Sequence, residues 1–82
     1  MGQVFRSKRD FCVAVNSNDH QPAHVHTYGK GLDARFGLNC PDGPVEYWDH
    51  EGAWKLKHLN ELGQEIADRL TQCCDEWRRV HG

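Results

Sequence analysis

The C-terminal part of the chain has apolar residues at steps of three or four positions, and this pattern constrains the fold most. They are Leu59, Leu62, Ile66, Leu70, Cys73, Trp77 and Val80. This spacing lines one face of an α-helix, which becomes stable by packing against another element. Asn60 is a suitable N-cap, and Arg78 and Arg79 complement the negative end of the helix dipole. The pattern predicts one long C-terminal helix.

Short runs rich in β-branched and aromatic residues precede this helix and are typical of strands. The expected strands are 4–7, 11–15, 23–28, 32–38 and 45–48, and segment 53–57 is either a sixth strand or the approach to the helix. The fourth run is the clearest, because its apolar residues alternate with Asp33, Arg35 and Gly37. We therefore expect an α+β fold, with an antiparallel sheet of about four to six short strands packed against one long helix.

Length and charge limit the classes of protein that the chain can belong to. Its 82 residues have room for one hydrophobic core, so a single domain over residues 1–82 is expected. The formal net charge of −2 creates no general field that favours nucleic acid. No leader sequence and no long apolar run is present, so we expect no membrane span and a cytoplasmic location. The four cysteines, Cys12, Cys40, Cys73 and Cys74, are accordingly expected as reduced thiols.

A histidine-rich segment, Asp19-His20-Gln21-Pro22-Ala23-His24-Val25-His26, is the most distinctive chemical feature of the chain. The polar residues 16–19 before it predict a turn, and the chain then enters a strand. On that strand His24 and His26 project to the same face, about 6.5 to 7 Å apart. The turn would fold Asp19 and His20 back toward them, and we expect the segment to be accessible at the surface.

Two interpretations of this segment involve no catalysis. In the first, Asp19 and the histidines hydrogen-bond the turn or rest on an aromatic ring such as that of Tyr28. In the second, the segment binds zinc, because neutral imidazole is a common zinc ligand and Asp19 or water can fill the fourth position. The candidate ligands are His20, His24 and His26. Neither a metal nor another cofactor is required by the first interpretation.

A third interpretation is a histidine-dependent, nuclease-like enzyme. Two imidazoles can share the protonation states needed to cleave a phosphodiester, with Lys30 or Arg35 stabilising the developing charge. Cys12 falls in an expected strand and Cys73 on the helix stripe, so both are expected as buried thiols and not as nucleophiles. Enzymatic activity therefore ranks behind binding.

Aromatic residues outside the helix indicate a surface for a partner. Trp77 lies on the helix stripe and is expected in the core, but Tyr47, Trp48 and Trp54 cannot all be buried in so small a domain. An exposed tryptophan is a suitable anchor for a protein partner. We therefore expect a non-catalytic binding or regulatory protein that acts through a protein partner. The expected binding residues are Asp19, His20, His24, His26, Tyr28, Trp48 and Trp54.

The histidine segment, followed by Tyr28-Gly29 and by the strand around Ala34, resembles domain-of-unknown-function family 4160. This family comprises small prokaryotic and phage-borne proteins with an Asp-His-x-Pro-Pro-His-aromatic-His core. Here Ala23 stands at the second proline and Val25 at the aromatic position. The resemblance implies the same fold class and a gene beside a small partner, as in a toxin–antitoxin pair, or a phage-borne accessory protein. It implies no established activity.

Overall fold

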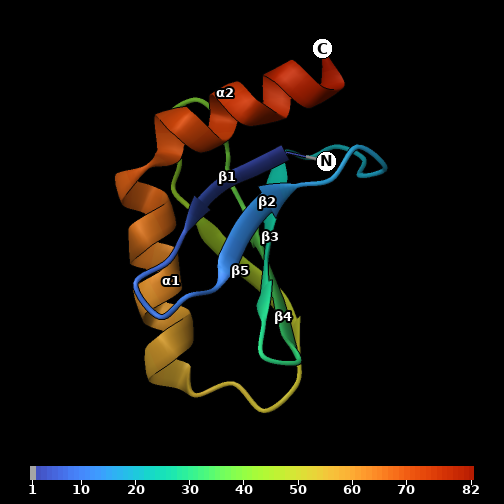
Figure 1. The fold of residues 1–82 in the computed structure, drawn as a ribbon. Coiled ribbons are helices and arrows are strands. Elements are labelled where there is room, and N and C mark those ends of the chain that lie inside the picture. Colours follow the sequence, from blue (N-terminus) through green and yellow to red (C-terminus); the bar gives the residue numbers. More distant parts are fainter. Residues whose placement is uncertain (1) are drawn as a thin grey trace.

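The computed structural model describes residues 2–82, which form five strands followed by two helices (Figure 1). The strands are β1 (Gly2–Arg6), β2 (Cys12–Val15), β3 (His24–Gly29), β4 (Leu32–Gly37) and β5 (Glu46–Glu51). The helices are α1 (Leu56–Asp68) and α2 (Leu70–His81). The strands pair antiparallel and follow the order of the chain across the sheet. The α+β fold predicted from the sequence is confirmed.

The turn between β3 and β4 fixes the register of the central hairpin. Its two residues, Lys30 and Gly31, have φ angles of 53° and 77°, as a two-residue type I′ turn requires. The pairing that results places His24 opposite Gly37 and His26 opposite Arg35. This turn therefore decides which side chains of β4 lie beside the two strand histidines.

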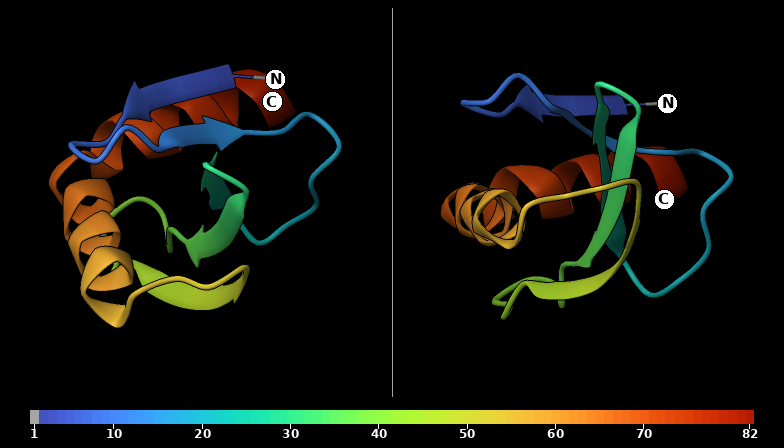
Figure 2. Two further views of the ribbon diagram at one scale, coloured as in Figure 1. Left: turned by 60° about the horizontal axis from the view of Figure 1, so that its bottom comes forward. Right: turned by 90° about the horizontal axis from the view of Figure 1, so that it is seen from below.

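The sheet curves around the helices, so that β1 and β5 lie on opposite sides of them (Figure 2). Residues of the concave face and of the helices form the core, namely Phe11, Val13, Val15, Val25, Ala34, Phe36, Leu38, Leu59, Leu62, Ile66, Cys73, Cys74 and Trp77. Side chains alternate between the faces of a strand. Because Val25 is in the core, His24 and His26 belong to the outer face.

The expected single helix is interrupted at Arg69. This residue has φ −119° and ψ 28°, outside helical geometry, and it separates α1 from α2. The apolar spacing continues through Ile66 and Leu70, so periodicity alone does not detect the break. α2 runs at an angle to α1 and packs against β1 and β2 (Figure 1). The bend lets one apolar stripe follow the curved sheet.

The start of the first helix also differs from the expectation. α1 begins at Leu56, and the preceding Lys55 has extended geometry without a side-chain cap. Asn60, the expected N-cap, lies inside the helix. Segment 53–57 forms no strand. Residues 53–55 connect β5 to α1, and residues 56–57 are the first two residues of α1. Trp54 instead anchors this connection by donating from Nε1 to the backbone oxygens of Asp33 and Glu51.

The expectation of four reduced thiols is wrong for two of them. Cys40, in the loop after β4, and Cys74, on α2, form a disulfide. The two cysteines are 34 positions apart in the sequence, and only the fold brings them together. Cys12 and Cys73 are free and buried, as expected. Within residues 2–82, neither helix is long and apolar enough to span a membrane.

Candidate metal centre

Asp19, His24 and His26 converge at the end of the sheet where β3 begins. One ligand atom from each residue lies within 4.8 Å of the other two. His24 and His26 come from β3. Asp19 ends the polar turn that follows β2, where its backbone N–H donates to the Asn16 oxygen. The sequence therefore predicted correctly that the two strand histidines share a face.

The Asp19 carboxylate approaches the same nitrogen of both imidazoles. Its Oδ2 atom lies 3.0 Å from Nε2 of His26 and 3.3 Å from Nε2 of His24. Oδ1 is 3.1 Å from Nε2 of His26, in hydrogen-bonding geometry. Oδ2, by contrast, is buried and has no hydrogen-bond partner among the described residues. A buried carboxylate oxygen is thus aimed at two nitrogens without a hydrogen bond to either.

The other ring nitrogen of each histidine faces an acceptor. Nδ1 of His24 is 2.9 Å from the backbone oxygen of Pro22, and because a carbonyl only accepts, this nitrogen carries the proton. Nδ1 of His26 is 3.9 Å from Oδ1 of Asp33, beyond hydrogen-bonding distance, so the hydrogen bond of this ring is the one between Nε2 and Asp19. Histidines that bind metals usually hold their second nitrogen as His24 does. Both Nε2 atoms are oriented toward the centre of the cluster.

Two tryptophans enclose His24. The centroid of its ring lies 4.7 Å from that of Trp48 and 5.4 Å from that of Trp77. His24 is only 4% exposed, so the expectation of an accessible segment is wrong at this position. The side chain of His26 is 17% exposed, and it borders an outer groove of about 370 Å³ that Asp33, Arg35 and Asp49 also line. Of the three residues of the centre, His26 alone lines this groove.

Gly37 allows Trp48 to reach His24. The register places Gly37 directly opposite His24, and a Cβ atom at Gly37 would overlap the indole of Trp48. Trp48 itself lies at an irregularity in the pairing of β4 with β5. Because Gly37 has no side chain, the indole ring of Trp48 has room to cover His24.

We expect Gly37→Ala to displace Trp48 and to lower the free energy of unfolding by about 1–3 kcal/mol, because the added methyl group overpacks the site. Gly63→Ala is the matched control, since outside its own helix its Cβ would meet only Phe36 among the described residues, at 3.6 Å. Urea denaturation and tryptophan fluorescence measure both effects. Unchanged stability and emission in Gly37→Ala would contradict the described packing.

The C-terminal end of α2 supports the turn that carries Asp19. The rings of Trp77 and His81 stack with centroids 3.9 Å apart. Nε2 of His81 donates to the backbone oxygen of Asn16, at 3.1 Å. Because Trp77 also contacts His24, the helix supports both the strand and the turn of the centre.

Several residues expected at the site lie elsewhere. His20 is exposed and outside the group of converging ligand atoms. Tyr28 sits further along β3, opposite Cys12, and a hydrogen bond with this cysteine raises the pKa of Tyr28. Trp54 packs on Phe11, with ring centroids 4.6 Å apart. Of the two expected tryptophans, only Trp48 therefore adjoins the centre.

Both cations expected to assist catalysis have partners outside the cluster. Lys30 donates to the backbone oxygen of Arg9. Arg35 is paired with Asp49, with Nε 2.9 Å from Oδ1. This hydrogen bond lowers the pKa of Asp49 and raises that of Arg35. Arg35 and Asp49 are therefore both charged.

Comparisons with protein-family models, curated proteins and solved structures find no match. The resemblance of the histidine segment to family 4160 consequently stays a prediction. The function has to be inferred from the geometry of Asp19, His24 and His26.

Proposed function

We propose that the protein binds a divalent transition-metal ion, with zinc as the preferred ion, through Asp19, His24 and His26. The observation that carries this proposal is the buried Oδ2 atom of Asp19, which lies beside two imidazole nitrogens and has no hydrogen-bond partner within residues 2–82. An unsatisfied buried polar atom costs about 1–3 kcal/mol. A cation bound between the three side chains would remove this cost.

The tautomer of His24 supports a cation at this position. Since Nδ1 donates to the Pro22 oxygen, neutral His24 presents a lone pair at Nε2. This lone pair faces the lone pairs of Asp19 Oδ2 at 3.3 Å. Two lone pairs in contact repel each other, whereas a metal ion accepts both. The alternative is a protonated imidazole, which competes with the metal for the same position.

Two of the three distances between the ligand atoms match the coordination shell of zinc. Zinc binds imidazole nitrogen and carboxylate oxygen at about 2.0–2.2 Å, so neighbouring ligand atoms of a tetrahedral site lie about 3.3 Å apart. The contacts from Asp19 Oδ2 to the two Nε2 atoms measure 3.0 and 3.3 Å. These two edges therefore need little adjustment to receive an ion.

The types of donor favour transition metals. Two imidazoles and one carboxylate suit zinc and also Fe²⁺, whereas Mg²⁺ and Ca²⁺ prefer oxygen donors. Asp33 beside His26 supplies further negative charge. With three ligands from the protein, a zinc ion keeps a coordination position for water or another ligand. We infer a metal-binding protein with an open coordination position, and not an enzyme that uses histidines alone.

The test is isothermal titration of the metal-free, oxidised protein with zinc chloride. We expect one ion per chain, and at least tenfold weaker binding in Asp19→Asn and His26→Gln because each removes a ligand. His20→Gln is the matched control, because His20 belongs to the same segment but lies outside the cluster. Asp19→Asn also removes the negative charge beside the unsatisfied Oδ2 position, so its fold should persist without zinc.

Two further measurements test the choice of ion. Excess Mg²⁺ should leave the zinc titration unchanged. If Fe²⁺ binds more tightly than zinc under anaerobic conditions, Fe²⁺ and not zinc is the preferred ion. Equal zinc affinities for His26→Gln and His20→Gln would disprove the proposed site.

A further inference from the structure

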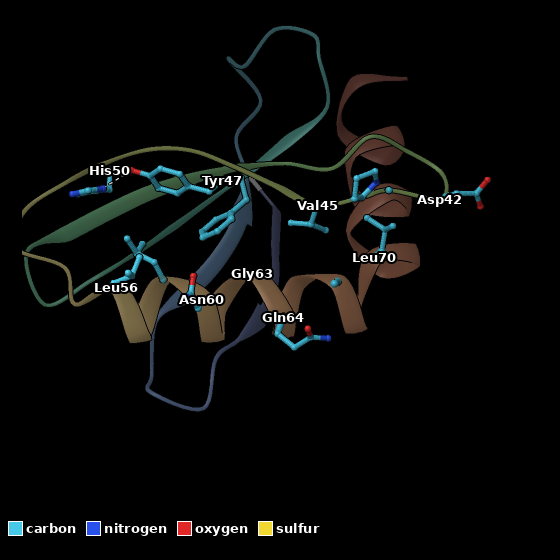
Figure 3. Close-up of a pocket in the computed structure, with 14 residues that line it drawn as sticks. Asp42, Val45, Tyr47, His50, Leu56, Asn60, Gly63, Gln64 and Leu70 are labelled. Atoms are coloured by element: carbon cyan, nitrogen blue, oxygen red, sulfur yellow. Dashed lines mark hydrogen bonds between the residues drawn. The ribbon is translucent and has the colours of Figure 1, made fainter.

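We propose that β5 and the groove beside it bind an extended segment of a partner protein, with alternating basic and apolar residues, which joins the sheet as a sixth strand. The surface consists of β5 and of the groove between this strand and α1 (Figure 3). None of its residues is a ligand of the proposed metal centre, although Trp48 of β5 covers His24 on the other side of the strand from the groove. The inference therefore stands independently of zinc binding.

β5 is an outer strand with a free edge. The sheet ends at β5, which pairs only with β4 among the described strands. Five of its six residues are exposed. An outer strand presents unpaired backbone N–H and C=O groups that another strand can join. Backbone hydrogen bonds to an added strand are thus available along this edge.

The groove beside β5 is lined mainly by apolar residues. Its volume is about 710 Å³, within the range of about 300–1,000 Å³ usual for ligand-binding clefts. Its larger apolar side chains are Phe36, Val45, Tyr47, Leu56, Leu59 and Leu70. Tyr47, 49% exposed, and Leu56, 72% exposed, are the exposed large hydrophobic residues within residues 2–82. Both border this groove, so the exposed apolar surface is concentrated beside the free strand edge.

The charge along β5 selects the chemistry of the occupant. Glu46 and Glu51 are exposed at the two ends of the strand, and Asp42 lies at the end of the groove. Asp49 is already paired with Arg35. Lysine or arginine side chains on alternate positions of a bound strand would face the remaining carboxylates, while the intervening apolar side chains would enter the groove.

A second copy of the chain is a poorer occupant than a basic segment. Antiparallel pairing of two β5 strands would bring Glu46 of one copy toward Glu51 of the other. Like charges placed opposite each other destabilise a strand pair. The acidic strand therefore disfavours edge-to-edge association of identical chains.

The probe is a library of random linear heptapeptides displayed on phage and selected against the full-length, oxidised protein. We expect enriched sequences in which apolar residues alternate with lysine or arginine. The best peptide, made synthetically, should slow hydrogen exchange of the β5 amides that do not bond to β4. Enrichment of helically spaced or acidic sequences, or of none, would overturn the proposal.

Substitutions separate charge recognition from apolar recognition. Glu46→Gln with Glu51→Gln should weaken peptide binding about tenfold, as expected for two lost surface charge pairs. The matched control is Asp10→Asn with Asp75→Asn, which removes the same charge outside the groove and should leave the affinity unchanged. Leu56→Glu should abolish binding, because it removes an apolar contact of the groove. The helix should tolerate this change, since an acidic residue is favourable at the first position of α1. Equal affinities in all these variants would contradict the assigned surface.

Two controls distinguish this surface from the metal centre and from a dimer interface. Asp19→Asn should bind the peptide with wild-type affinity, because the metal centre is separate from the groove. Sedimentation should show a monomer at micromolar concentration. A dimer that Glu51→Lys strengthens would identify a second copy as the occupant and overturn the proposal of a basic partner segment.

Discussion

Zinc should stabilise this domain strongly. At a free zinc concentration one hundred times the Kd, we expect the free energy of unfolding to rise by about 2.7 kcal/mol, because the ion binds the folded chain only. For a domain of this size the melting temperature should then rise by about 10–20 °C. The three ligands come from the turn after β2 and from β3, so unfolding disperses them.

Calorimetry with and without zinc measures this effect. His20→Gln should keep the full zinc-induced shift of the melting temperature, whereas His26→Gln should lose it. Calcium at the same concentration should have no effect, because imidazole nitrogen is a poor ligand for it. A zinc-induced shift of equal size in both variants would show that zinc binds elsewhere on the chain.

Removing the disulfide should have the second large effect. We expect Cys40→Ser with Cys74→Ser to lower the free energy of unfolding by about 2–4 kcal/mol, because the cross-link restricts the unfolded chain over 34 residues. Average values per residue give a domain of this length a total stability of only about 4–12 kcal/mol. The loss is therefore a large part of the total.

Urea denaturation under oxidising and reducing conditions measures this contribution. Reductant should destabilise the natural chain to the level of the double variant and leave the variant unaffected. The buried thiol of Cys73 provides little background reaction, since burial raises its pKa to about 11. Equal stability of both proteins without reductant would contradict a stabilising role for the Cys40–Cys74 bond.

Local sequence patterns were sufficient to predict the sheet and the helical region. Alternation along 32–38 is a property of adjacent residues, and strand β4 (Leu32–Gly37) forms there. The break at Arg69 was missed because the apolar spacing is the same on both sides of it. No local pattern indicates the Cys40–Cys74 bond, which depends on how α2 lies relative to the loop after β4.

The candidate centre was predictable in part. Strand periodicity placed His24 and His26 on one face, and the polar turn made Asp19 a candidate neighbour. Periodicity does not determine how a turn folds, so it could not separate Asp19, which joins the cluster, from His20, which does not. Periodicity also does not predict that Trp48 packs on His24. A glycine within a strand, as at Gly37, does indicate that another group approaches the backbone closely.

The anomalous scattering of zinc in crystals of the zinc-loaded protein tests the central claim most directly. We predict one peak that lies about 2.0–2.2 Å from Asp19 Oδ2 and from Nε2 of both His24 and His26. His20 should lie outside the coordination shell. A peak bound by other residues, or no peak between these three side chains at saturating zinc, would contradict the proposed metal centre.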